Sequence, residues 1–469
     1  MGGIFGVVTG ENCTKPLFYG TDYHSHLGTE SAGLAVLGDD GFCNTIHSIS
    51  QAQFKSRFVD DYRKTRGWAG IGAIDDQSPQ PLIIRSKFGT YALAATGLIT
   101  NKEPLTAKLL REGASFNEMA DGGVNSVELV AKLINRGENV VDGIVRMQRA
   151  IEGSVCLLLM TGEGIYAARD RVGRFPLVIG REIGSAGSSP GYAAATESSA
   201  FPNLGYETVR SLGPGEIVRL DREGIHEEQP AGDQKHVCAF LWIYTGYPAS
   251  IYEGINVENA RERCGRAMAR GDDIEADLVA GVPDSGVGNA IGYAVESGLP
   301  FRRPLVKYTP GYGRSYTPPS QDIRDLVATM KLSAIRDVIE GNRMVICEDS
   351  IVRGTQLKNY TIRKLWDNGA KEIHIRPACP PLMFPCIYAS STRSVAELAA
   401  HRAIRDLEGD HERYLEEYLD HHSKRYRNMV EWIRRELDVT SLKYLHIDAM
   451  VAAIGLPEEQ LCLYCWRGR

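Results

Sequence analysis

The clearest chemistry in the sequence is a pair of acidic residues followed by a turn of small residues. The stretch from 343 to 355 reads RMVICEDSIVRGT, in which an apolar run that predicts a buried strand ends at Glu348 and Asp349. A small-residue turn follows, before a helix expected to begin near Gln356, and it contains Ser350, Gly354 and Thr355. Backbone N–H groups of such a turn bind phosphate, and adjacent carboxylates suit ribose hydroxyls or hydrated Mg²⁺. The stretch predicts a site for a phosphorylated sugar, and a capped strand–helix turn with solvated acids is the alternative.

A second candidate is the pair Cys462 and Cys465 in the terminal C-L-Y-C segment. This spacing suits Zn²⁺ or an iron–sulfur cluster, but a chance pair near a chain end is an equal alternative. The chain has ten cysteines. We expect a reducing, cytoplasmic location, where most thiols are buried and inert rather than paired as disulfides.

The residues up to about 233 predict an α+β domain. Short apolar runs such as GGIFGVV, YALAATGLIT and GEIVRLDREG are separated by turn residues, which is typical of antiparallel strands. Two helical patterns interrupt them, near 126–136 and 141–150. A polar stretch with Pro and Gly, at about 226–236, is interpreted as an interdomain linker.

The residues from 234 to 469 follow a different pattern. Helical segments alternate with buried strands, as in ADLVAGVPD, GNAIGYAVESG, RMVICEDS and KEIHIRPAC, and this alternation indicates a parallel sheet. A long charged helical pattern covers 401–437. We therefore expect two domains, 1–233 and 234–469, the second ending in a helical tail.

Composition excludes some classes of function. The chain has 469 residues and a formal net charge of −6, which argues against a broad nucleic-acid-binding surface. No apolar run approaches the roughly 20 residues that a membrane span needs. We therefore expect neither a nucleic-acid nor a membrane partner.

Several segments carry a family resemblance. E-D-S-I-V-R-G-T resembles the phosphoribosyl pyrophosphate (PRPP) loop of type I phosphoribosyltransferases. The segments VPDSGVGNAIGYAVESGLPF, GRSYTPPSQ, GAKEIHIRPACPP and PGEIVRLDREG resemble glutamine PRPP amidotransferases, and the likeness runs from GGIFGVV to the terminal CLYC. The resemblance implies an N-terminal-nucleophile-type αββα glutaminase domain followed by an α/β type I phosphoribosyltransferase domain. It also implies a pentosyltransferase of purine biosynthesis that assembles as a homodimer or homotetramer.

The PRPP site is implied residue by residue. Glu348 and Asp349 match the paired acids of the loop, although the family usually has two aspartates. The residues that match the 5′-phosphate cradle are Ser350, Arg353, Gly354 and Thr355. Asp284 and Ser285 match the V-P-D-S turn near the pyrophosphate, and with the two loop acids they mark the implied Mg²⁺ site.

Two cations are implied as catalytic, Lys307 and Arg314, which would neutralise the leaving pyrophosphate. They belong to a loop, KYTPGYGRSY, that resembles the family's closing loop but is one residue longer; it also holds Tyr312, Gly313 and Ser315. Closure would exclude water from a hydrolysable intermediate. Ordinary surface charge is the alternative for both side chains.

The amino-terminal site departs from the family. The family's nucleophile is a terminal cysteine just ahead of G-I-F-G, where this chain has Gly2. The arginine that grips the glutamine carboxylate aligns with Asp75, the oxyanion asparagine with the Thr96 region, and the amine-binding acid with Ser126. Gly97 remains from the oxyanion segment, and the family's H-R-G-Q-E aligns with 26–30. We expect no glutaminase activity; Cys13 lies after the first strand and is expected to be a buried thiol.

Four cysteines match the ligands of a [4Fe–4S] cluster that some family members carry. They are Cys238, Cys386, Cys462 and Cys465, whereas Cys379 aligns with a serine. A structural [4Fe–4S] cluster is the favoured interpretation, with Zn²⁺ or four unliganded thiols as alternatives.

The favoured function is an amidophosphoribosyltransferase-type enzyme that forms phosphoribosylamine from PRPP and ammonia, with Mg²⁺ as cofactor. The ammonia would come from solution or from a separate glutaminase. One alternative is a regulatory pseudoenzyme that binds PRPP or nucleotides, and another is a phosphoribosyltransferase with a different amine acceptor.

Overall fold

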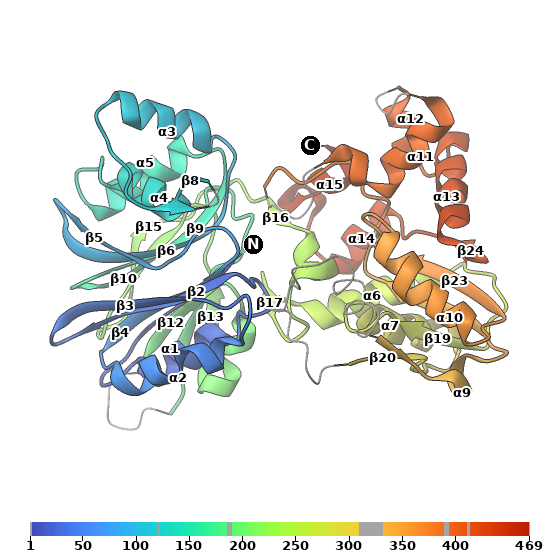
Figure 1. The fold of residues 1–469 in the computed structure, drawn as a ribbon, viewed down its shortest axis with the longest axis horizontal. Coiled ribbons are helices and arrows are strands. Elements are labelled where there is room, and N and C mark those ends of the chain that lie inside the picture. Colours follow the sequence, from blue (N-terminus) through green and yellow to red (C-terminus); the bar gives the residue numbers. More distant parts are fainter. Residues whose placement is uncertain are drawn as a thin grey trace.

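The computed structural model describes residues 2–120, 122–184, 190–308, 332–388, 394–409 and 413–468. Two parts lie side by side, with the blue-to-green strands in one and the yellow-to-red elements in the other (Figure 1). Among these residues no helix is long and apolar enough to cross a membrane.

The first part contains two stacked antiparallel sheets. The order of the seven-stranded sheet is β13 (Tyr206–Ser211), β11 (Val178–Glu182), β12 (Tyr192–Ala195), β1 (Gly3–Val8), β4 (Ala69–Asp75), β2 (Ser31–Gly38) and β3 (Gly41–Ser48). The order of the six-stranded sheet is β15 (Ile225–Gln229), β14 (Ile217–Leu220), β10 (Gly164–Ala168), β9 (Gly153–Thr161), β6 (Gly89–Ile99) and β5 (Leu82–Ser86). A short hairpin joins β7 (Met119–Ala120) and β8 (Gly123–Val124).

Helices cover the outer faces of the two sheets (Figure 1). They are α1 (Thr14–Asp22), α2 (Phe54–Lys64), α3 (Lys102–Arg111), α4 (Ser126–Ile134) and α5 (Val140–Ala150). Strand β1 is buried on both faces: Ile4 and Val8 contact the core between the sheets, whereas Phe5 and Val7 contact the core under the helices. Because successive side chains of a strand point to opposite faces, this run is apolar throughout. The αββα prediction is confirmed.

The second part is built on a parallel sheet in the order β19 (Leu278–Gly281), β22 (Arg343–Glu348), β23 (Glu372–Pro377) and β24 (Ser441–Leu442). Helix α7 (Val287–Ser297) follows β19, α9 (Arg336–Ile339) precedes β22, and α10 (Arg363–Asp367) lies between β22 and β23. Helix α6 (Val257–Ala269) packs on α7. Along β22, Val345 and Cys347 contact one core and Met344 and Ile346 the other. Burial on both faces explains the continuous apolar run, and the α/β prediction is confirmed.

Smaller elements complete this part. Two short antiparallel pairs are β17 (Ile251–Tyr252) with β18 (Ile255–Asn256), and β20 (Leu305–Lys307) with β21 (Leu332–Ala334). The tail contains α11 (Ala399–Glu408), α12 (Leu415–Leu419), α13 (Lys424–Leu437), α14 (Ile447–Ile454) and α15 (Tyr464–Arg467). The charged pattern over 401–437 is therefore several helices, since α11 ends at Gly409, whose φ of 77° is left-handed.

The predicted linker is partly wrong. Residues 225–229 form β15, which pairs with β14 at the edge of the six-stranded sheet. Polar residues suit such an edge strand, because one side faces solvent. The chain then reaches β16 (Val237–Cys238) and a π-helical turn, η3 (Leu241–Thr245). A domain boundary at 233/234 remains a proposal.

Candidate functional site

The two predicted loop acids lie at the carboxyl end of β22, where ligands of open α/β sheets bind. The side chains of Glu348 and Asp349 are 8% and 5% exposed. Glu348 Oε1 accepts the Asp349 N–H at 3.1 Å, and Ser350 Oγ donates to Asp349 Oδ1 at 2.6 Å. Burial, followed by the negative charge of Asp349, raises the pKa of Glu348 well above its usual value. A site that confines two carboxyl groups in this way is suited to a cation or to sugar hydroxyls.

The V-P-D-S turn lies at the same edge of the sheet. Strands β19 and β22 run parallel with Gly281 opposite Cys347, and the Val282 N–H donates to Cys347 O at 3.0 Å. Gly286 packs against this carbonyl so closely that a Cβ would collide with it, and glycine is therefore required there. The structure thus brings the 282–286 turn beside the loop acids.

Lys307 ends β20, and its Nζ lies 3.0 Å from Asp284 Oδ2. Both side chains are substantially exposed, so the pair is weak and free to open for a ligand. Ser285 lies in the same turn as Asp284. Arg314, the second predicted catalytic cation, lies outside the described residues, together with Tyr312, Gly313 and Ser315.

The turn after the acids has the geometry that its sequence predicts. Gly354 has a φ of 76°, and helical structure starts at Thr355, one residue before the expected start. Arg353 Nη2 pairs with Glu397 Oε2 at 2.5 Å, and Arg402 Nη2 donates to Arg353 O at 2.6 Å. Contacts from the residues before α11 and from α11 itself therefore anchor the turn.

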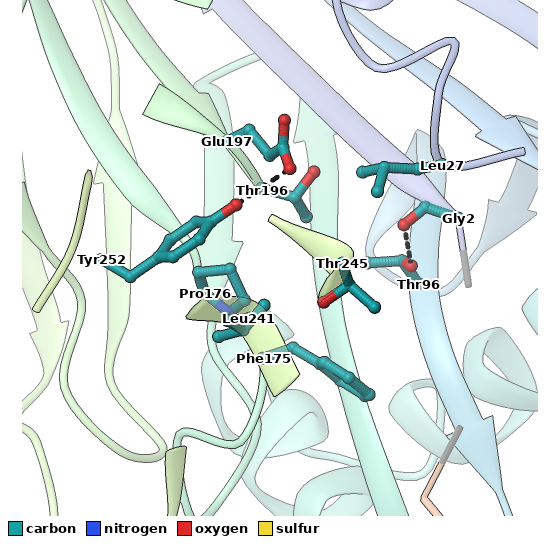
Figure 2. Close-up of a pocket in the computed structure, with 10 residues that line it drawn as sticks. All are labelled: Gly2, Leu27, Thr96, Phe175, Pro176, Thr196, Glu197, Leu241, Thr245 and Tyr252. Carbon is teal, nitrogen blue, oxygen red and sulfur yellow. Dashed lines mark hydrogen bonds between the residues drawn. The ribbon is translucent and has the colours of Figure 1, made fainter. Parts of the chain in front are cut away.

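A pocket lies between the two parts of the molecule (Figure 2). It has about 340 Å³ of empty space, its solvent-side opening included. Its lining comes from both parts: Gly2, Leu27, Thr96, Phe175, Pro176, Thr196, Glu197, Leu241, Thr245 and Tyr252. No arginine or lysine is among these described residues, so none of the side chains that line the pocket is a cation that would hold the carboxylate of an amino acid.

Gly2 lies in the wall of this pocket, where the Thr96 hydroxyl donates to Gly2 O at 2.6 Å (Figure 2). A Cβ at position 2 would lie 2.6 Å from Ile74 O and 3.2 Å from Asp75 Oδ1. The first of these is fixed backbone, so a larger residue would displace β4. The structure therefore brings Gly2, Thr96 and Asp75 together and leaves no space for a side chain at position 2.

Asp75 aligns with the cationic clamp that the family resemblance predicts, and it lies beside Gly2. Gln80 Nε2 donates to its Oδ2 at 2.8 Å, and the Gln77 N–H donates to its Oδ1 at 3.3 Å. Burial, the largest influence, raises the pKa of Asp75 to about 6. Ser126 begins α4, with its N–H donating to Ser78 Oγ, and is not among the pocket-lining residues.

The sequence interpretation missed Glu197, the acidic residue of the pocket. Its side chain accepts a hydrogen bond from Tyr252 Oη at 2.9 Å and lies 2.8 Å from His26 Nε2. These contacts lower its pKa although burial acts in the opposite direction. Glu197 follows β12 in the first part and Tyr252 belongs to β17 in the second, so the pair ties the parts together. Glu197 is a single acidic residue outside any recognisable motif, so the sequence alone did not indicate that it lines a pocket.

The four predicted cluster cysteines form two pairs near the junction of the two parts. Parallel pairing of β16 with β25 (Leu461–Cys462) sets Cys238 opposite Cys462. The Cys465 thiol is hydrogen-bonded to that of Cys386, and both interact electrostatically with Cys238. Cys379 is fully buried in the core against which Cys238 and Cys465 pack. Within the described ranges, no group of three or more His, Cys, Asp or Glu side chains is arranged to hold a metal ion as it stands.

Comparison with known proteins finds relatives that span both parts of the molecule. Residues 71–199 match the family model of a glutamine amidotransferase domain. The amidophosphoribosyltransferase of Bacillus subtilis is 32% identical over 100% of this chain and 93% of its own length. That of Methanocaldococcus jannaschii is 30% identical over 100% of this chain and 97% of its own.

The chain belongs to the amidophosphoribosyltransferase family.

Solved structures agree with this assignment. Glutamine PRPP amidotransferase from B. subtilis, in complex with ADP and GMP, matches with a TM-score of 0.84 and 30% identity, over 100% of this chain and 96% of that one. The structure described as the allosteric regulatory enzyme of purine biosynthesis matches with a TM-score of 0.83. The resemblance seen in the sequence is confirmed, whereas the individual site residues remain predictions.

In this amidophosphoribosyltransferase fold, Arg261 of α6 is a further residue that the sequence interpretation missed. It is buried, and its guanidinium donates to Trp242 O at 3.0 Å, Tyr244 O at 3.1 Å and Gly246 O at 3.0 Å. Burial lowers its pKa, whereas Asp349 is the leading influence that raises it. Arg261 therefore fixes η3, which lines the pocket, on α6.

Proposed function

We propose that the chain transfers the phosphoribosyl group of PRPP to ammonia, forming phosphoribosylamine for de novo purine biosynthesis. The nitrogen lone pair of ammonia forms a bond to C1 of the ribose. The bond from C1 to the pyrophosphate oxygen breaks, and pyrophosphate leaves with the electron pair, while the new amine loses a proton to water. The observation that carries this proposal is the pair of buried acids at the end of β22 beside the V-P-D-S turn, in a chain of this family.

Each residue has a proposed role. Glu348 and Asp349 hold the ribose hydroxyls, and the backbone of the Ser350–Thr355 turn, with Arg353, cradles the 5′-phosphate. Lys307 leaves Asp284 to meet the pyrophosphate, and Arg314 joins it. Carboxylate oxygens at Asp284, Glu348 and Asp349, with the Ser285 hydroxyl, have the donor chemistry that Mg²⁺ prefers. Bound there, Mg²⁺ would neutralise charge on the pyrophosphate.

The test is pyrophosphate release from PRPP with Mg²⁺ and ammonium. Release that depends on ammonium and yields phosphoribosylamine supports the proposal. Release only with another amine would make the chain a different phosphoribosyltransferase. Binding of PRPP without release would make it a regulatory binding protein. The homodimer or homotetramer expected from the resemblance is tested on the same preparation by light scattering.

We further propose that ammonia is not made by the chain itself. The described residues that line the pocket around Gly2 include no arginine or lysine, and a Cβ at position 2 would collide with Ile74 O; both observations support this view. Ammonia would then come from solution or from a separate glutaminase.

We also propose a structural [4Fe–4S] cluster on Cys238, Cys386, Cys462 and Cys465. Support comes from the pairing of Cys238 with Cys462 and of Cys386 with Cys465, which brings together segments from the interdomain junction, the core and the tail. A cluster there would attach the tail to the catalytic part, and binding free energy at such a site is also folding free energy.

The cluster predicts that anaerobically purified protein is brown and holds about four irons per chain. Cys462→Ser should lose the colour and lower the thermal unfolding temperature, because the tail loses its attachment. The exposed Cys43 gives a matched control, and Cys43→Ser should change neither. A colourless protein with one zinc per chain would contradict the iron–sulfur assignment.

A further inference from the structure

Helix α11 of the tail holds one side of the turn that follows the loop acids. The Ala399 N–H, at the start of this helix, donates to Val352 O at 2.8 Å. Three residues later, Arg402 Nη2 donates to Arg353 O at 2.6 Å. Two successive carbonyl groups of the turn therefore point toward α11, and the second accepts its hydrogen bond from a charged donor, which is the stronger kind.

The direction of these carbonyl groups sets the direction of two backbone N–H groups. Both peptides are trans, and in a planar trans peptide the N–H points away from the C=O. The N–H groups of Arg353 and Gly354 therefore point away from α11, and neither donates to another of the described residues. Gly354 has a left-handed φ of 76°. Adjacent N–H groups that point the same way beside a left-handed residue are typical of an anion-binding turn.

Arg402 also brings positive charge to this turn. It is partly buried, and the centre of its guanidinium lies 5.9 Å from the centroid of the Trp432 ring of α13, close enough for a weak cation–π contact. Its Nε is buried and has no hydrogen-bond partner among the described residues. The neighbouring acid, Glu397, pairs with Arg353 instead. The charge of Arg402 can therefore stabilise an anion on the far side of the peptide between Arg353 and Gly354.

We propose that Arg402 is a positioning residue for the 5′-phosphate of PRPP. It fixes the peptide between Arg353 and Gly354 so that both N–H groups face the phosphate, and it places a positive charge behind them. This inference rests on the proposed function. It gives the first helix of the tail a part in substrate binding, although Arg402 itself does not touch the substrate.

The experiment compares two probes on the full chain by calorimetry. Ribose 5-phosphate carries the 5′-phosphate, whereas pyrophosphate with Mg²⁺ does not. Arg402→Gln should weaken binding of ribose 5-phosphate about 10–100-fold, the range expected for loss of a hydrogen bond from a charged group, and should leave pyrophosphate binding unchanged. The KM for PRPP should rise by a similar factor with little change in kcat, because the 5′-phosphate is not a reacting group.

Two further variants separate positioning from a general effect on the helix. Arg402→Lys keeps the positive charge and one donor, and it should recover most of the affinity for ribose 5-phosphate. Arg405 lies on the same helix and is exposed, so Arg405→Gln is the matched control and should bind both probes as the native chain does.

The outcomes distinguish this inference from the proposed function. Equal affinities of the native chain and Arg402→Gln for ribose 5-phosphate would overturn the role of Arg402 and leave the proposed function intact. Equal weakening of both probes would also overturn it, because the variant would then disturb the site as a whole. Selective weakening of ribose 5-phosphate binding, in a chain that releases no pyrophosphate with ammonium, would support the role of Arg402 and refute the proposed function.

Discussion

Asp349→Asn should reduce the rate of ammonium-dependent pyrophosphate release by about two orders of magnitude or more. Asp349 is buried at the end of β22, where its charge would meet the ribose of PRPP. Loss of one preorganised polar contact at a reacting group typically costs 10²–10³-fold in rate. The loss of a carboxylate from a cation-binding site should fall in the same range.

The variant should remain folded. Asparagine has the same shape, and its side-chain oxygen can still accept the hydrogen bond that Ser350 Oγ donates to Asp349 Oδ1. The negative charge that raises the pKa of Glu348 would also disappear, which relieves an unfavourable interaction. A thermal unfolding temperature equal to or above that of the native chain is therefore expected.

Asp337 provides the matched control. It is an exposed aspartate in α9, and Asp337→Asn should leave the rate unchanged. If Asp349→Asn turned over PRPP at the native rate, the site would have to lie elsewhere in the molecule.

The fold class of each part could be predicted from the sequence, because strands that are buried on both faces are apolar along their whole length. The apolar run of β22 and the turn residues between the strands of the first part gave the two architectures. The charged pattern over 401–437 predicted helical structure correctly, but it did not show that the region is divided into α11, α12 and α13, with Gly409 left-handed after α11. The polar strand β15 was interpreted as linker because an edge strand needs few apolar residues.

The site was only partly predictable, for a different reason. The loop acids and the V-P-D-S turn are each a short continuous stretch of sequence, so each can be recognised as a motif. Glu197 and Arg261 have no motif, and their importance comes from packing between segments that are separated in the chain. A charged residue that is buried between two segments can be recognised only when the positions of both segments are known.

The chain should release no glutamate from glutamine, and Gly2→Cys should not change this result. A thiol at position 2 would still meet Asp75 where the substrate carboxylate must bind, and like charges repel there. The pocket contains no arginine or lysine to compensate. Without positioning, a nucleophile loses the roughly 7–11 kcal/mol that well-oriented attack can contribute.

Packing gives a second reason for the failure. The Cβ of any residue at position 2 would lie 2.6 Å from Ile74 O, which is backbone of β4, an inner strand of the seven-stranded sheet. Overpacking of this kind typically costs about 1–3 kcal/mol. Gly2→Ala carries the same Cβ without a thiol, so both variants should lower the thermal unfolding temperature by a similar amount.

The double variant Gly2→Cys with Asp75→Arg separates the two reasons. It restores a thiol and a cation but keeps the steric conflict with Ile74 O, and we expect it to remain inactive on glutamine while ammonium still supports pyrophosphate release. Glutamate release by the double variant alone would show that charge, and not space, disables the site. Glutamate release by the native chain, at a rate comparable to pyrophosphate formation, would mean that a thiol other than one at position 2 attacks glutamine. Cys13 is the first to test, although its burial raises the pKa of the thiol to about 12 and so opposes formation of a nucleophilic thiolate.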